Sequence, residues 1–250
     1  GGKTEECPTP YVTFKAEAEQ KLMMTTEGGY TFSNLEYSVN NSEWASVAIG
    51  TEIPFGGAKG DLRLRGINPN GTATELYAYS TIKFTEANVN VACTGDIRTL
   101  QDWRNYNIVE TNNARFCYLF LNCSVLTSAP ELPATKLAVS CYTSMFAGCT
   151  SLTAAPELKT TELAASCYNN MFYGCTSLTS APELKATTLA NGCYFGMFNG
   201  CASLTAAPKL PATELERLCY GDMFCNCTSL ESAPELPATK LAENCYYEMF

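Results

Sequence analysis

The stretch Cys141-Tyr-Thr-Ser-Met-Phe-Ala-Gly-Cys149-Thr-Ser-Leu-Thr-Ala-Ala-Pro-Glu-Leu158 recurs, with small changes, through the second half of this chain. Its Cys-Tyr pair marks the repeat. The spacings are 24, 26, 26, 26 and 26 residues between Cys117, Cys141, Cys167, Cys193, Cys219 and Cys245. A period of about 20–29 residues is typical of leucine-rich-repeat solenoids. Such arrays present a long surface and no enclosed pocket, which favours binding over catalysis.

The part of each unit that holds the Cys-Tyr pair has the spacing of a helix. One apolar face would carry Leu163, Cys167, Tyr168, Met171 and Phe172, which follow an i, i+4, i+5, i+8, i+9 pattern. The residue before the second cysteine of a unit accepts the left-handed conformation that closes a helix. These residues are Asn122, Gly148, Gly174, Gly200 and Asn226. We therefore expect a helix in every unit.

The other part of each unit, Leu-Thr-x-Ala-Pro-x-Leu, is expected to be extended. Because proline cannot donate to a sheet ladder, the parallel strands here should be only three or four residues long. The prolines are Pro130, Pro156, Pro182, Pro208 and Pro234. Stacked units would share one core of Leu, Met, Phe and Cys.

The N-terminal half alternates apolar and polar residues, as in Tyr11–Glu19 and Asp61–Arg65, with turn residues between the runs. This pattern predicts a β-sandwich, immunoglobulin-like or similar, over residues 8–92. Residues 93–115 would form a linker and N-terminal cap, and 116–250 the repeats. The expected fold class is α+β multidomain: an all-β sandwich, then a right-handed leucine-rich-repeat solenoid of short parallel strands plus helices. We expect the native protein to continue beyond Phe250.

Composition excludes several classes of function. The net charge is −9, and the repeats hold six Lys/Arg against eleven Asp/Glu, which argues against a nucleic-acid partner. The chain has no histidine, which removes Ser-His-Asp and Cys-His catalysis. No apolar run is long enough for a transmembrane helix. We therefore predict a non-enzymatic protein without a cofactor or a metal site.

Fourteen cysteines suggest disulfides or metal, but their spacing favours neither. Cys141 and Cys149 would lie about 12 Å apart on a helix, and a disulfide needs Cα atoms within about 7 Å. We favour two ladders of buried, unoxidised thiols. Cys225 occupies a variable position and should be exposed. A bridge between Cys7 and Cys93 is left open.

The candidate binding residues lie mainly in the extended segments. One column is Glu131, Glu157, Glu183, Lys209 and Glu235, in which Lys209 should pair with Glu183 and Glu235. A second column is Thr127, Thr153, Thr179, Thr205 and Glu231. Each column could be a ligand or cation ladder, but a solvated face copied by repeat duplication is the favoured interpretation. Trp44 could be a ligand platform, although such a residue more often covers a sandwich core.

The unit Cys-Tyr-x-x-Met-Phe-x-Gly-Cys-Thr-Ser-Leu-Thr-x-Ala-Pro-Glu-Leu, at Cys141–Leu158 and Cys167–Leu184, resembles that of BspA-like bacterial surface leucine-rich-repeat proteins. The stretch Leu35–Trp44 looks like the sandwich modules that precede such arrays. The unit here is longer than usual for that family and has a proline in its strand. The resemblance implies a secreted or cell-surface protein, in some members an adhesin for host matrix proteins or other bacteria.

Two functions follow as expectations. The first is an extracellular or cell-surface binding and adhesion protein that uses the repeat array as a protein-interaction surface. The alternative is a glycan-binding accessory surface protein with the sandwich as the binder. Exposed aromatic residues on one sandwich face, such as Tyr37 or Trp44, would favour the alternative.

Overall fold

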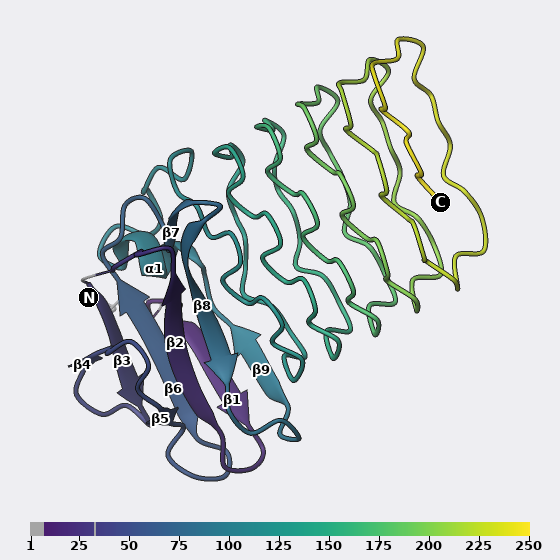
Figure 1. Ribbon diagram of the computed structural model, residues 1–250. Helices are drawn as coiled ribbons and strands as arrows, with labels where there is room; N and C mark the ends of the chain where they lie inside the picture. The colour runs from purple at the N-terminus through teal and green to yellow at the C-terminus, as the bar shows by residue number, and fades with distance from the viewer. Residues whose placement is uncertain (1–7, 33) are drawn as a thin grey trace, which may run out of the picture.

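The computed structural model describes residues 8–32 and 34–250 (Figure 1). Cys7, one partner of the bridge considered above, lies outside these residues, and Cys93 has a free, buried thiol. Among the described residues, no helix has the length and apolar character needed to cross a bilayer.

The N-terminal half forms two antiparallel sheets with strand orders β4-β3-β6-β1-β9 and β5-β2-β8-β7. The strands are β1 (Val12–Ala16), β2 (Lys21–Glu27), β3 (Leu35–Val39), β4 (Ala45–Ser46), β5 (Ile53–Pro54), β6 (Asp61–Gly66), β7 (Ala73–Glu75), β8 (Ala78–Phe84) and β9 (Val91–Thr94). They are followed by the five-residue helix α1 (Arg98–Asp102).

The alternating pattern decides which face of each strand is buried. In β1, Val12 and Phe14 point inward, and in β6 Leu62 and Leu64 do the same. The residues between them point outward, because successive side chains of a strand lie on opposite faces. The outer face of the five-stranded sheet therefore carries polar side chains of β1, β3 and β6, such as Lys15, Glu36 and Arg63.

The repeats contain no helix anywhere in residues 116–250, all of which the structure describes. The expected α+β fold, with a helix in every unit of a leucine-rich-repeat solenoid, is therefore wrong. Figure 1 shows the repeats as a stack of coils without regular helices or long strands. The segment around each Cys-Tyr pair consists of overlapping turns.

In these turn segments, half of the backbone N–H groups bond within their own coil and half bond to the next coil. Every second N–H bonds within its own coil, as from Met145 to the carbonyl of Tyr142 at 3.1 Å. The N–H groups between them bond to the next coil, as from Phe146 to the carbonyl of Met171 at 3.0 Å. Both directions are satisfied without a helix, so burial leaves few unpaired polar groups.

Left-handed residues occur at every fourth position of the turn segments, with φ between 43° and 76°. They form three columns along the stack: Ser140, Ser166, Gly192, Leu218 and Asn244; Tyr118, Ser144, Asn170, Gly196, Asp222 and Glu248; and Asn122, Gly148, Gly174, Gly200 and Asn226. The third column is the one predicted to end helices. Its residues are left-handed, but they do not end helices. From the second unit on, each is the third left-handed residue of its turn segment, as Gly148 is after Ser140 and Ser144.

The extended segments are held together much less regularly. The expected strands of three or four residues are reduced to isolated parallel bridges, such as Leu132 with Leu158 and Ala154 with Ser180. Each segment contains a proline that cannot donate, which limits pairing between coils.

The first coil hydrogen bonds to one strand of each sheet. The N–H of Ile82 in β8 bonds to the carbonyl of Leu119 at 2.7 Å, and the N–H of Val91 in β9 bonds to that of Val125 at 2.9 Å. Buried side chains form a single core that runs from the sandwich into the coils. The sandwich therefore bounds the stack at its N-terminal end.

Two aromatic columns fill the interior of the stack. Ring centroids of Phe146, Phe172, Phe198 and Phe224 are 5.7–5.8 Å apart between neighbouring coils. Those of Tyr142, Tyr168, Tyr194 and Tyr220 are 5.8–5.9 Å apart. From the second unit on, the second cysteine of a unit donates its thiol, at 3.1 Å, to the carbonyl of the phenylalanine in the preceding coil; these pairs are Cys149–Phe120, Cys175–Phe146, Cys201–Phe172 and Cys227–Phe198.

These thiols should resist alkylation in the folded protein. Burial raises the pKa of Cys175 to about 12 and that of Cys227 to about 11, so both are protonated at pH 8. The thiolate is the nucleophile, and these sulfurs are also out of reach of a reagent. Iodoacetamide at about pH 8 should label Cys225, which is partly exposed, before any other described cysteine. Peptide mapping by mass spectrometry measures this; rapid labelling of Cys175 without denaturant would contradict the buried ladder.

Candidate binding surfaces

The charged column predicted from the sequence lies on the surface of the stack. Glu131, Glu157, Glu183, Lys209 and Glu235 are all exposed. Lys185 lies between two of the glutamates, with its Nζ 3.4 Å from Glu157 and 3.8 Å from Glu183. The side chains of these glutamates are 64% and 75% exposed, so each ion pair contributes little to stability. The ion pairs of the described residues do not include the expected pairing of Lys209.

The second column lies in the extended segments, at a position where some neighbouring coils hydrogen bond to each other. Thr153, Thr179, Thr205 and Glu231 are exposed, and Thr127 is partly buried. The N–H of Glu231 donates to the carbonyl of Thr205 at 3.1 Å. The Thr179 hydroxyl donates to the carbonyl of Thr153 at 3.4 Å. The register of the coils therefore brings these side chains into one row.

Shallow grooves separate the extended segments of neighbouring coils. One groove of about 300 Å³ lies between Ala129–Pro133 and the segment that holds Pro156, Glu157 and Lys159. Another, of about 480 Å³, lies between Ala206–Pro211 and Ser232–Pro237. Four members of the charged column, Glu131, Glu157, Lys209 and Glu235, line these grooves. Prolines form much of the walls, because the segments they interrupt do not close against each other.

Trp44 does not cover the sandwich core; it lies on the outer face of the five-stranded sheet. The Arg65 guanidinium carbon lies 4.2 Å from the centre of the Trp44 ring and 4.1 Å from that of Trp103. The Nε of Arg65 also donates to Glu36 at 2.7 Å. The guanidinium is thus held between two indole rings and a carboxylate, an arrangement that arginine favours. We name these four residues the Arg65 cluster.

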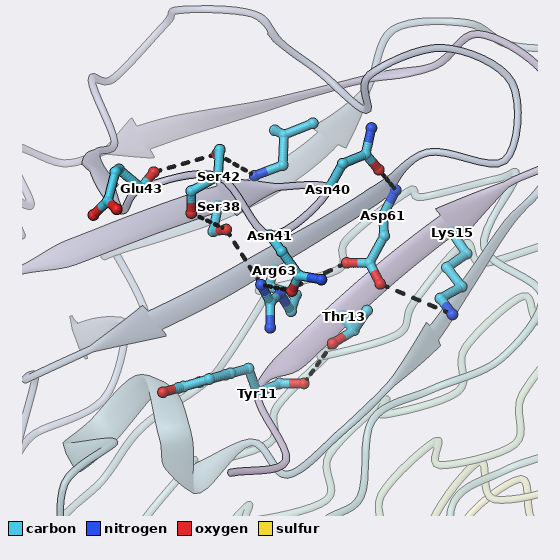
Figure 2. A network of polar contacts seen from close by, with 11 residues as sticks. Tyr11, Thr13, Lys15, Ser38, Asn40, Asn41, Ser42, Glu43, Asp61 and Arg63 are labelled. Atoms are coloured by element: carbon cyan, nitrogen blue, oxygen red, sulfur yellow. Dashed lines mark hydrogen bonds and ion pairs between the residues drawn. The ribbon is translucent and has the colours of Figure 1, made fainter. Parts of the chain in front are cut away.

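A polar network continues the Arg65 cluster along the same face (Figure 2). Arg63 lies beside Trp44 and hydrogen bonds to Asn41 and, at 3.4 Å, to Ser38. Asp61 lies 3.8 Å from Arg63 and 3.9 Å from Lys15. Most of these charges and amides are thus paired with each other. Their contacts connect β1, β3 and β6 on the outer face of the sheet.

Sequence reasoning missed Arg63, Arg65 and Trp103. One signal was available: the two arginines are the outward residues of the alternating run Asp61–Arg65, which places both on one face. Trp103 could not be found this way, because it reaches the sheet from the segment that follows α1. Arg65 is the residue that connects them.

Replacing Arg65 by alanine should lower the free energy of unfolding by about 1–2 kcal/mol, because two cation–π contacts and one ion pair are lost. Trp44 and Trp103 are the two tryptophans of the chain, so their fluorescence reports on this cluster directly. The emission should shift toward that of solvated indole. Arg65→Lys keeps the charge and should fall between the two. Unchanged emission in Arg65→Ala would contradict the described packing.

In the part of the chain that the structure describes, no three side chains of Cys, Asp or Glu come together as metal ligands could. The large pKa shifts belong to the core, where burial raises the pKa of Tyr168 and Cys149 well above their usual values. Tyr168 and Cys149 fill the interior of the stack.

No match was found between this chain and protein-family models, curated proteins or solved structures. The resemblance to BspA-like proteins therefore depends on the quoted residues alone.

Proposed function

We propose that the chain is an extracellular or cell-surface binding and adhesion protein, not an enzyme, and that the coil array is its protein-interaction surface. The observation that carries this proposal is the register of the stack. Equivalent side chains of successive coils form exposed rows, and shallow grooves lie between neighbouring coils, lined by members of the charged column.

The hydrogen bonds between coils make this surface well suited to binding. Each turn segment is fixed to the next by alternate N–H groups, and the aromatic columns pack behind it. A surface that is already ordered loses little conformational entropy when a partner binds. The grooves are open and shallow, which suits an extended protein partner better than a small substrate.

The alternative, a glycan-binding sandwich, loses the two aromatic residues that would have favoured it. Tyr37 is partly buried and packs against the core. One face of Trp44 is covered by Arg65 at 4.2 Å. Neither ring offers a free platform on the outer face of the five-stranded sheet.

The test is binding of the full chain to immobilised collagen, fibronectin and laminin, measured by biolayer interferometry. Glu157→Gln with Glu183→Gln alters the charged column beside the grooves. Glu162→Gln with Glu214→Gln removes the same charge from exposed positions in the same array, where the glutamates pair with Lys136 and Lys240. We expect the first pair to weaken binding about tenfold and the second to have little effect. Equal loss in both would indicate nonspecific charge attraction, and no binding to any of the three would count against the proposal.

A further inference from the structure

A separate cleft lies where the sandwich meets the first coil. Its floor is the outer face of β2 and β8, and its wall is the segment Leu121–Val125. The volume is about 300 Å³, at the small end of the range for ligand pockets. The cleft is distinct from both the grooves between the coils and the Arg65 cluster.

The strand register orders the side chains on the floor. Met23 pairs with Lys83, Thr25 with Thr81, and Glu27 with Tyr79, so these residues share one face. Lys83 and Glu27 are two pair steps apart, about 13 Å along the strands. The cleft thus has a cation at one end, a carboxylate at the other, and threonine hydroxyls between them.

Several polar side chains of this cleft are free to bind a ligand, whereas the hydroxyls of Thr25 and Thr81 donate to the carbonyls of Thr81 and Tyr118. Among the hydrogen bonds of the described residues, none involves the side chains of Glu27, Tyr79, Lys83 or Asn122. Their lack of partners contrasts with the outer face of the five-stranded sheet, where Arg63 contacts Asp61 and Ser38 (Figure 2) and Arg65 pairs with Glu36. The first surface is equipped to hold a ligand, and the second holds the fold together.

We propose that this cleft binds a neutral carbohydrate of one or two sugar units. The Glu27 carboxylate, the Asn122 amide and the hydroxyls of Tyr79 and Ser124 can donate to or accept from the hydroxyls of a sugar. The Tyr79 ring, which packs against Tyr118 with ring centroids 4.4 Å apart, adds apolar surface beside them. One lysine and one glutamate leave the site without net charge, which disfavours phosphorylated and other anionic ligands. The small volume excludes a long chain from the cleft itself.

Asn122 offers a substitution that should not disturb the fold. Its φ is 59°, and the equivalent position of the next three coils is glycine. Asn122→Gly therefore removes the amide side chain and keeps the backbone conformation. Asn226 has φ 60° in the same column at the other end of the array, so Asn226→Gly is the matched control. Glu27→Gln, with Glu75→Gln on the same sheet as control, tests the carboxylate.

The experiment is saturation-transfer-difference NMR of the full chain with glucose, galactose, mannose, N-acetylglucosamine, lactose, maltose and cellobiose, each up to about 10 mM. We expect at least one sugar to bind, and Asn122→Gly and Glu27→Gln each to weaken it about tenfold while the controls leave it unchanged. Triglycine, a zwitterion of similar length, is the competing probe. Absence of any sugar signal, unchanged binding in Asn122→Gly, or binding of triglycine in place of sugars would each overturn the proposal. Binding to matrix proteins through the coils would be unaffected by all of these results.

Discussion

Replacing Phe172 by alanine should lower the free energy of unfolding by about 3–5 kcal/mol, the usual cost of deleting a large buried aromatic side chain. Phe172 is fully buried, and its ring stacks between Phe146 at 5.7 Å and Phe198 at 5.8 Å. The cavity would interrupt the aromatic column in the middle of the array. Neighbouring coils cannot close it, because the hydrogen bonds between coils fix their spacing.

Denaturation of the full chain with guanidinium chloride, followed by circular dichroism, measures this effect. Tyr173→Ala is the matched control, since Tyr173 follows directly in the chain and its side chain is 49% exposed. That variant should change stability by less than about 0.5 kcal/mol. A Phe172→Ala variant about as stable as Tyr173→Ala would show that the stacked column is not the core of the array.

The double variant Gly192→Ala, Gly196→Ala should be destabilised by about 2–4 kcal/mol. Both glycines have positive φ, 57° and 60°, where each side chain costs about 1–2 kcal/mol. A Cβ at position 196 would also lie 2.1 Å from the Asn170 Oδ1, which would have to move. In a helix the same two changes would stabilise by about 1 kcal/mol each. The sign of the effect therefore separates turns from a helix.

Leu218→Asn is the reciprocal control for this prediction. Leu218 occupies the column of Gly192 with φ 57°, and asparagine stands there in the next coil, at Asn244. Because asparagine tolerates the left-handed region better than leucine does, stability should not fall. Thermal unfolding of all variants gives the comparison. A stabilised alanine variant together with a destabilised Leu218→Asn would contradict the turn structure.

The repeat itself could be read from the sequence, but the local structure of the unit could not be read from apolar spacing alone. The pairs Cys167-Tyr168 and Met171-Phe172 recur every four residues, and a helix of 3.6 residues per turn accommodates that spacing over a short segment. A series of overlapping turns with a left-handed residue every four positions gives the same four-residue spacing. One unit distinguishes a helix from such turns, because it contains Gly192, Gly196 and Gly200. Three glycines at that spacing are poorly suited to a helix and well suited to left-handed turns.

The candidate surfaces were predictable to different degrees. The charged column follows from the period alone, because equivalent positions of stacked units form rows. The Arg65 cluster and the cleft beside β8 each combine segments that are distant in sequence, and no local pattern indicates such contacts. The neighbours of Trp103 and Asn122 depend on the path that the chain follows after β6 and β9. The local sequence does not indicate that path.

The thiol–carbonyl bonds and the alternating backbone ladder have a consequence for how such an array can change its length. The interface between one coil and the next repeats the same contacts along the array. Duplicating or deleting one whole 26-residue unit would therefore join surfaces that already fit each other. Gene-level gain or loss of units could lengthen or shorten the surface without a single compensating substitution, whereas an insertion of any other length would put every column out of register.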